Sequence, residues 1–286
     1  MIEMRAAGAL TTVQDLGRPG HAHLGVTRSG ALDRPALRLA NRIVGNDPGT
    51  AGLEITLTGC TIRCLHPATV AVTGAPARIA KGRRECRYGA AIPLGPGDIL
   101  EIGPALVGVR SYLAVAGGIE VPPVLGSRST DTLSGLGPSP LKTGDVLPIG
   151  LLQRDVPPAS VDFVPTQPAG GPVHLRLRFG PRDDWFPPEA RELLAEPYSL
   201  SMDANRVGAR LAGPALPRVD PGRQLPSEGV VLGSVQVTPD GRPLVFLADH
   251  PTTAGYPVIG VVHEADLPAL AQARPGDSVI FHGSER

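Results

Sequence analysis

The sequence predicts a mainly β protein of barrel-like domains with a few short helices. Short runs of Val, Leu and Ile are bounded by Gly, Pro or Asp, which is typical of strands that end in tight turns. Gly (36 residues) and Pro (32 residues) are spread between these runs, which indicates turns rather than a disordered tract. Helix signals are few. Many short strands with frequent turns favour β-barrel-like domains.

The first helix signal lies at residues 34–44. Asp33 can accept a hydrogen bond at the N-terminus of this helix, Pro35 is tolerated in its first turn, and Gly45 ends it. Shorter helices are expected at residues 187–194 and 266–273, the second with Asp266 as its cap.

Strand signals follow along the whole chain. Residues 174–179 alternate polar and apolar side chains with a period of two, which predicts a half-buried strand. The other runs are rich in β-branched and apolar residues. The expected strands are residues 69–73, 108–116, 174–179, 230–237, 244–248 and 258–262.

A Gly-Asp pair precedes an apolar strand three times, at Gly97-Asp98, Gly144-Asp145 and Gly276-Asp277. Glycine supplies a turn conformation that other residues resist, and we expect Asp to bond the backbone N–H groups that follow it. Between the second and third copies, residues 153–172 hold five prolines and are interpreted as a connector. We therefore expect an N-terminal β-barrel-like domain at residues 1–165 and a C-terminal one at 166–286.

Composition excludes several classes of function. There are 27 basic and 27 acidic residues, so the basic excess of a nucleic-acid-binding protein is missing. No apolar run approaches the ~20 residues that span a bilayer, and no signal peptide is visible, so no membrane contact and a cytoplasmic location are expected. Cys60, Cys64 and Cys86 form no CxxC motif, which disfavours a disulfide framework or a cysteine zinc site.

Several cofactor and catalytic motifs are missing as well. Neither Lys81 nor Lys142 lies in a P-loop, so no nucleotide site of this type is expected. A Met-Lys dipeptide, the attachment site of biotin, does not occur, nor do Gly-x-Ser-x-Gly and HExxH. His21 and His23 lack a completing set of ligands, so no metal site is expected.

Four segments are denser in Gly, Asp, Arg, Ser and Thr than structure alone requires. Single residues in them have structural interpretations, such as a turn salt bridge between Asp15 and Arg18 or a helix cap at Asp33. The segment at 249–257 contains more potentially reactive side chains than the others, because it places a carboxylate, an imidazole, two hydroxyls and a phenol at a strand end. The four segments are residues 11–20, 29–33, 200–208 and 226–257.

Eight stretches between about Thr11 and about Val262 together carry a resemblance to a known family. They are TTVQDLGRPG, SGALD, SYLAVAGGI, GSRSTD, GPRDDWF, LSMDANRVGARL, PSEGVVLGSVQV and ADHPTTAGYP. In these stretches the chain resembles the biotin-dependent carboxyltransferase, or allophanate hydrolase subunit 2, family. The resemblance implies cyclophilin-like β-barrel domains. It also implies a heteromer with a B subunit of the kinase-inhibitor type, and with an A subunit of the LamB/YcsF type when the assembly is a 5-oxoprolinase.

The resemblance implies three alternative functions. The first is the C subunit of an ATP-dependent 5-oxoprolinase, inactive alone, with ATP used by the assembled complex. The second is a carboxyltransferase acting on urea or an amide, with biotin on a separate carrier. The third is a regulatory partner that binds the kinase-inhibitor-type protein. Independent allophanate hydrolase activity is not expected, because neither Lys81 nor Lys142 fits a Lys-Ser-Ser set.

The candidate site residues come from the four polar segments. Asp249 and His250 are the candidate acid/base groups, and Glu228 is the expected carboxylate partner of His250, because Asp249 and His250 alternate across their strand. Arg18, Asn205 and Arg206 are expected to donate hydrogen bonds to the substrate or to a phosphorylated intermediate. The full set of expected substrate-binding residues is Asp15, Arg18, Ser29, Asp33, Asn205, Arg206, Ser227, Gln236, Thr252, Thr253 and Tyr256.

Overall fold

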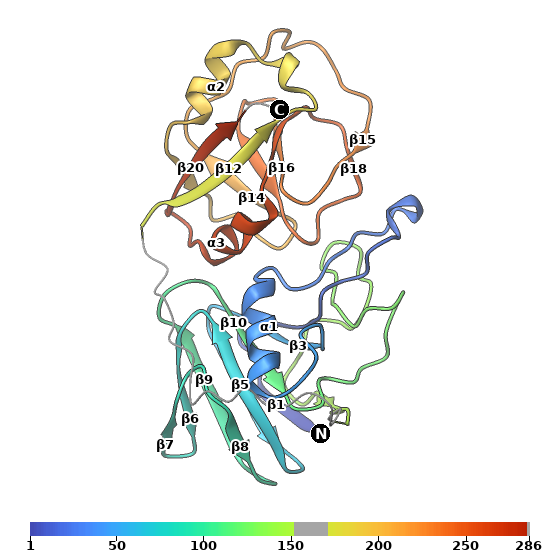
Figure 1. Ribbon diagram of the computed structural model, residues 1–286, viewed down its shortest axis with the longest axis vertical. Helices are drawn as coiled ribbons and strands as arrows, with labels where there is room; N and C mark the ends of the chain where they lie inside the picture. The colour runs from blue at the N-terminus through green and yellow to red at the C-terminus, as the bar shows by residue number, and fades with distance from the viewer. Residues whose placement is uncertain (152–170, 285–286) are drawn as a thin grey trace. The chain divides into compact units, whose positions relative to one another are not determined.

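The computed structural model describes residues 1–151 and 171–284, which divide into two compact units (Figure 1). The first unit comprises Met1–Arg18, Ser29–Asp131 and residues 135–151. The second comprises Pro19–Arg28, Thr132–Ser134 and residues 171–284. The expected boundary near residue 165 and nearly all of the expected connector lie outside the described residues. Two short segments from the N-terminal half of the sequence thus belong to the second unit.

The first unit contains two antiparallel sheets rather than one closed ring of strands. The six-stranded sheet has the order β11-β1-β4-β9-β6-β7, and the five-stranded sheet has the order β2-β3-β10-β5-β8. The strands are β1 (Ile2–Ala6), β2 (Leu10–Gln14), β3 (Gly52–Thr56), β4 (Cys60–Cys64), β5 (Ala68–Gly74), β6 (Ala77–Lys81), β7 (Arg84–Cys86), β8 (Ile92–Leu94), β9 (Ile99–Ala105), β10 (Arg110–Val115) and β11 (Val146–Leu147).

Both sheets contribute to a single apolar core. Met4 and Leu100 come from the six-stranded sheet, Leu53, Val72 and Leu113 come from the other sheet, and all five are fully buried. Each such side chain contributes about 1.5–3 kcal/mol when it leaves water. The core is therefore built from aliphatic side chains, as the low aromatic content of 3% requires.

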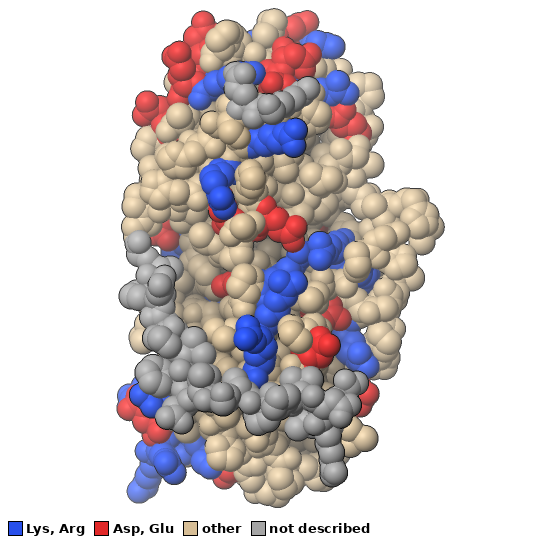
Figure 2. Space-filling view, viewed as in Figure 1, with Lys and Arg blue, Asp and Glu red and all other residues tan. Residues whose placement is uncertain are grey.

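Helix α1 (Arg34–Ile43) packs small side chains against β5 and β10 and confirms the predicted helix. Asp33 accepts a hydrogen bond from the Ala36 backbone N–H at 3.0 Å, and Gly45 takes a left-handed conformation (φ 79°) just beyond the helix. Arg38 and Arg42 lie one turn apart on its exposed face, and Figure 2 shows a row of basic side chains over this region.

Among the described residues, none of the helices has the length and the apolar character that a membrane span requires.

The second unit contains a closed barrel with the strand order β12-β19-β16-β17-β14-β13-β20, so the predicted mainly β class with a barrel is confirmed. The ring closes through parallel pairing of β12 with β20, where Val173 lies opposite Val279. Two strands, β15 and β18, form a separate small sheet. The barrel strands are β12 (Val173–Phe179), β13 (Tyr198–Leu200), β14 (Gly208–Ala212), β16 (Ser234–Val237), β17 (Pro243–Phe246), β19 (Val258–Val262) and β20 (Ser278–Ser284).

The remaining elements of the second unit are short. The α-helices α2 and α3 confirm the two shorter helices that the sequence predicts. The expected strand at residues 230–237 is wrong in its first half, because Gly233 takes a positive φ (84°) and Ser234 N–H donates to Val231 O in a turn. The elements are β15 (Glu228–Gly229), β18 (Thr253–Ala254), α2 (Pro188–Leu194), α3 (Leu267–Gln272), and the 3₁₀ turns η1 (Ala22–Leu24), η2 (Asp183–Trp185) and η3 (Glu264–Asp266).

The three Gly-Asp turns each lead directly into a strand, but the aspartates bond backward rather than forward. In each copy the glycine takes a positive φ, between 86° and 95°. This turn brings the N–H of the residue three positions before the aspartate against its carboxylate. The donor and acceptor pairs are Gly95 to Asp98 (2.8 Å), Lys142 to Asp145 (2.7 Å) and Arg274 to Asp277 (2.7 Å). The expectation that these aspartates bond the following N–H groups is therefore wrong.

Asp266 does not cap helix α3 through its side chain, contrary to the sequence prediction. Its carboxylate instead accepts two hydrogen bonds from the Arg176 guanidinium, at 2.9 and 2.6 Å, and one from the Arg176 backbone N–H at 2.8 Å. The bonds from the Arg176 side chain lower the pKa of Asp266. This contact ties the start of α3 to strand β12.

We predict that Asp266→Asn destabilises the protein at pH 7 by up to about 1 kcal/mol, because the Arg176 side chain is largely exposed and solvent screens the pair. A carboxyl whose folded pKa is depressed stabilises the fold above its unfolded pKa of about 3.9, and this contribution is lost as the pH falls through the folded pKa. The melting temperatures of variant and wild type should therefore converge between pH 7 and pH 3. Asp203→Asn, on an exposed side chain, is the control; an equal gap at both pH values would contradict this account.

Candidate functional site

The residues proposed for the site fall into two groups, one in each unit. In the first unit, Asp15 anchors its own loop to the GSRSTD segment. Its Oδ1 accepts hydrogen bonds from Gly17 N (2.7 Å), Ser127 Oγ (2.7 Å) and Ser129 Oγ (2.5 Å), and its Oδ2 accepts one from Arg128 N (2.6 Å). Protein donors thus occupy both oxygens, which fits a positioning residue better than a substrate ligand.

Arg18 is fully buried, at 1% exposure, and it does not form the turn salt bridge with Asp15 that its spacing suggests. Its Nη2 donates to Ser129 O, and its Nε lies 3.4 Å from Val124 O. The remaining nitrogen, Nη1, has no hydrogen-bond partner. The guanidinium therefore holds the 124–129 loop through main-chain carbonyls, with no carboxylate among the described residues beside it.

Ser29 and Asp33 have mainly structural contacts in the same unit. Ser29 has a positive φ of 52°, which is uncommon outside glycine, and its Oγ donates to Thr130 O at 3.1 Å. Asp33 caps α1, as described above. The structure therefore brings Asp15, Arg18 and Ser29 together at one dipeptide, Ser129-Thr130.

A second buried network in this unit is absent from the sequence prediction. Glu54, at 1% exposure, accepts hydrogen bonds from Tyr112 Oη (2.7 Å) and Leu32 N (3.0 Å), and Arg110 Nε lies 3.7 Å from its other oxygen. Burial, followed by the charge of Glu54, raises the pKa of Tyr112. The feature of the sequence that could have predicted this network is a glutamate inside the otherwise apolar strand GLEIT. This network fixes the SGALD segment onto the five-stranded sheet.

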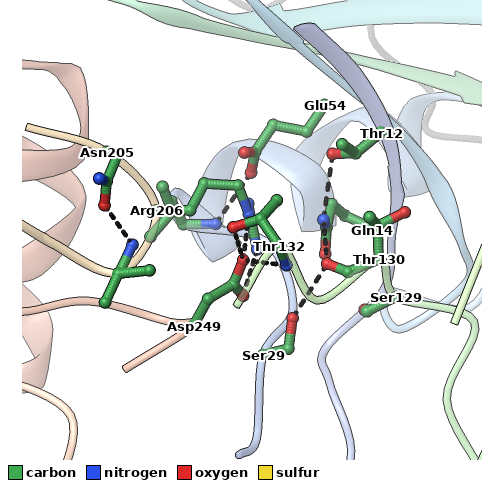
Figure 3. Close-up of polar contacts among 12 residues, drawn as sticks. Thr12, Gln14, Ser29, Glu54, Ser129, Thr130, Thr132, Asn205, Arg206 and Asp249 are labelled. Carbon is green, nitrogen blue, oxygen red and sulfur yellow. Dashed lines mark hydrogen bonds and ion pairs between the residues drawn. The ribbon is translucent and has the colours of Figure 1, made fainter. Parts of the chain in front are cut away.

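In the second unit, Arg206 and Asp249 form a buried ion pair (Figure 3). Arg206 Nε donates to Asp249 Oδ2 at 2.8 Å and Nη2 donates to Oδ1 at 3.0 Å, with exposures of 2% and 0%. Thr132 adds bonds to Oδ2 from its backbone N (2.9 Å) and its Oγ1 (2.7 Å). Asp249 is therefore an acceptor with its lone pairs engaged, and removing either partner would leave a buried charge at a cost of about 3–5 kcal/mol.

His250 is nearly buried, and its Nδ1 lies 2.6 Å from Pro251 O. Because a carbonyl only accepts hydrogen bonds, Nδ1 carries the proton of the neutral ring and Nε2 is the basic nitrogen. The expected pairing of His250 with Glu228 is wrong. The Glu228 carboxylate instead accepts hydrogen bonds from Arg182 Nη2 (2.7 Å) and Nε (3.0 Å), because a guanidinium offers it a two-point ion pair.

The other candidates in the second unit lie on turns and on the small sheet. Asn205 Oδ1 accepts hydrogen bonds from the backbone of Val207 (2.8 Å) and Gly208 (3.2 Å), so it stabilises its own turn. Gln236 Nε2 donates to Tyr256 O at 2.8 Å. Pairing of β15 with β18 places Glu228 opposite Ala254 and Gly229 opposite Thr253, and Val230 N donates to Thr252 O at 3.0 Å. Ser227, Thr253 and Tyr256 are exposed.

Sequence reasoning missed five residues that organise these groups: Gln14, Ser127, Ser129, Thr130 and Thr132. The GSRSTD motif was visible, but a run of Ser and Thr gives no sign of which distant side chain it binds. Within residues 1–151 and 171–284, no cluster of three His, Cys, Asp or Glu side chains could hold a metal ion.

Comparison with known proteins identifies the family. A family model described as "Carboxyltransferase domain, subdomain A and B" matches residues 24–283, and the chain belongs to this family. It is 40% identical to the C subunit of 5-oxoprolinase from Escherichia coli, over 98% of this chain and 90% of that protein. It is 34% identical to urea amidolyase of Saccharomyces cerevisiae, over 98% of this chain but 16% of that protein.

Solved structures agree with this assignment. The crystal structure of TTHA0988 superposes with a TM-score of 0.88 at 40% identity, over 98% of this chain and 55% of that chain. The Kluyveromyces lactis urea amidolyase gives a TM-score of 0.89 at 32% identity, over 98% of this chain and 18% of that chain. The chain thus spans about half of the first protein and less than a fifth of the second.

The two interpretations of Asp33 predict different variant behaviour. If Asp33 acts only as the cap of α1, Asp33→Asn should leave thermal stability and substrate affinity unchanged, because Asn caps as well as Asp, whereas Asp33→Ala should cost about 1 kcal/mol. We expect this outcome, measured by denaturant unfolding and by the KM of the assembled enzyme. A raised KM for Asp33→Asn at unchanged stability would instead assign Asp33 to the substrate.

Proposed function

We propose that this chain is the C subunit of an ATP-dependent 5-oxoprolinase and that it cleaves 5-oxoproline to glutamate together with two partner proteins, of the LamB/YcsF and kinase-inhibitor types. The observation that carries the proposal is similarity over nearly the full length of both proteins. The C subunits of the Escherichia coli and Haemophilus influenzae 5-oxoprolinases are each covered over 90% of their length. The urea amidolyases match only as a small region of a much longer protein.

The chemistry of this reaction fits the polar groups of the chain. A ring amide is resonance-stabilised and resists water, and phosphorylation of its oxygen by ATP makes the carbon a better electrophile. The protein must then hold a planar amide and a carboxylate and move protons at the ring nitrogen. Arginine N–H groups suit the anionic oxygens, and a neutral imidazole with a basic Nε2 suits the proton transfer.

Within this proposal, His250 is the acid/base group and the Arg206–Asp249 pair is a positioning element. Asp249 accepts bonds from both Arg206 and Thr132, so the segment that precedes His250 is fixed in place. The Nδ1–H bond to Pro251 O sets the tautomer of the imidazole. Together these contacts fix the tautomer of the imidazole and the backbone that carries it.

The second candidate function is carboxyl transfer to urea or an amide, and the family description favours it. In that case biotin arrives on a separate carrier, since the chain has no Met-Lys dipeptide. Co-expression with its candidate partner proteins separates the two functions. We expect formation of glutamate and ADP that depends on 5-oxoproline; carboxylation of urea from carboxybiotin without 5-oxoproline turnover would contradict the proposal.

We predict that the purified chain alone neither hydrolyses ATP nor carries biotin. The reason is the missing P-loop and the missing Met-Lys dipeptide. Phosphate release and calorimetry with ATP measure the first property, and a streptavidin blot measures the second. Tight binding of ATP by the isolated chain would contradict the first part, and a streptavidin-positive band would contradict the second.

We predict that His250→Asn lowers turnover by about 10²–10⁴-fold while the complex stays assembled. The asparagine amide can keep the donor bond to Pro251 O but supplies no equivalent of Nε2. Turnover and melting temperature are measured together, with His263→Asn, on an exposed histidine of the same unit, as the control. A normal rate in an intact complex would exclude the acid/base role, and a lowered melting temperature alone would assign His250 to structure.

A further inference from the structure

Two histidines of the second unit face each other on the outer surface of the barrel. His174 Nδ1 lies 2.8 Å from His282 Nε2, and the two rings stack with their centroids 5.0 Å apart. Both residues are exposed, so solvent and ions reach them. The two imidazoles therefore bring two nitrogen atoms together at one accessible place.

Pairing of β12 with β20 explains why these side chains meet. The two strands are parallel neighbours where the barrel closes, and Arg176 lies opposite His282 (Figure 1). Because side chains alternate between the faces of a strand, Leu175 and Phe281 are buried and the histidines lie on the outer face. His174 precedes Arg176 by two positions, so it lies diagonally to His282 on that face. Paired strands, rather than a loop, thus hold the two rings together.

The protons of the two rings can be arranged so that both facing nitrogens bind a cation. A neutral imidazole carries one proton, and one facing nitrogen now donates to the other. The far nitrogens, His174 Nε2 and His282 Nδ1, bond to no group in the described part of the chain. The donating ring can therefore move its proton to its far nitrogen, where water accepts the bond. Each facing nitrogen then presents the lone pair through which histidine binds metal ions.

The distance between the facing nitrogens suits one shared metal ion. Zinc–nitrogen bonds are about 2.0–2.1 Å long, so two nitrogens on one ion at bond angles of 90–109° lie about 2.9–3.4 Å apart. The observed separation of His174 Nδ1 and His282 Nε2, 2.8 Å, is slightly shorter. Small rotations of the two rings open this distance, because exposed side chains move readily.

The charge of the neighbouring Arg176 does not prevent a cation from binding. Its guanidinium donates to both carboxylate oxygens of Asp266, at 2.9 and 2.6 Å. The two opposite charges largely cancel at short range, so repulsion of a divalent ion is weak. Because Asp266 is engaged in this ion pair, the two histidines are the protein ligands and water completes the coordination.

We propose that His174 and His282 form a binding site for Zn²⁺ or Cu²⁺. Imidazole suits both ions, and Cu²⁺ binds a given set of nitrogens more tightly than Zn²⁺. One ligand comes from each of the strands that close the barrel, so the bound ion joins β12 to β20 and stabilises the folded second unit. This site is independent of the proposed function. The two histidines are 108 positions apart, which is why no sequence motif indicates the site.

Titration of the full chain with each ion tests the proposal. Calorimetry is performed on the chelator-treated wild type and on His174→Gln and His282→Gln, which lack one imidazole each. We expect one ion per chain, and we expect each substitution to weaken binding by at least about tenfold. His263→Gln is the matched control, because His263 is an exposed histidine of the same unit. Wild-type affinity in both single variants would overturn the site.

Spectroscopy and hydrogen exchange then locate the bound ion. Electron paramagnetic resonance of Cu²⁺ should show two nitrogen ligands in the wild type and one after either substitution. Saturating Zn²⁺ should slow amide exchange in β12 and β20. Sulfur ligands on the copper, or protection confined to other strands, would overturn the assignment.

Melting temperatures measure the proposed link between the two strands. Zn²⁺ should raise the melting temperature of the wild type and of His263→Gln, and it should leave His174→Gln and His282→Gln unchanged. Because the two rings also bond each other, a substitution can lower the melting temperature without metal, so the shift that the ion adds to each protein is compared. An affinity no greater than that of free imidazole would overturn the site, because two positioned ligands must bind more tightly than one free ligand. None of these readouts depends on turnover of 5-oxoproline.

Discussion

The carboxylate of Asp15 is the contact on which the first unit's polar loops depend. It accepts hydrogen bonds from residues 17, 127, 128 and 129, and so it joins two segments that are more than 110 residues apart in the sequence. Because this contact fixes Ser129, the carbonyls at 129 and 130 are in place for Gln14, Arg18 and Ser29. Asp15 acts through geometry, as a positioning residue.

Three charged side chains are buried, and they differ in the groups that surround them. Asp249 is neutralised by a two-point bond from Arg206 and further bonds from Thr132. Glu54 faces Arg110 and accepts a bond from the Tyr112 hydroxyl. Arg18 alone of these has only carbonyl oxygens around it. Since burying an uncompensated ion is costly, the first two carboxylates are paired with arginines, whereas the Arg18 guanidinium is stabilised by main-chain carbonyl oxygens.

The sequence predicts the local features well and the long-range ones poorly. Helix α1 follows from a cap, a proline and a glycine that are all within the helix or next to it, and the alternation at residues 174–179 gives strand β12. Glu228 and Asp266 were misassigned because their arginine partners, Arg182 and Arg176, lie 46 and 90 positions away. Nothing in a sequence pattern reports such distant pairs. The contact between Gln14 and Thr130 could not be predicted for the same reason, because the two residues are 116 positions apart.

The parallel closure of the barrel has a consequence for how the second unit forms. The ring is completed by β12 and β20, whose partners Val173 and Val279 are separated by more than a hundred residues. Closing so long a loop lowers the entropy of the chain before the buried contacts of the barrel have formed to compensate. Pairings between residues so distant in the sequence therefore make folding slow. Until β20 is available, both flanking strands present unpaired backbone edges. Folding of this unit therefore has to protect two open edges until its final strand arrives.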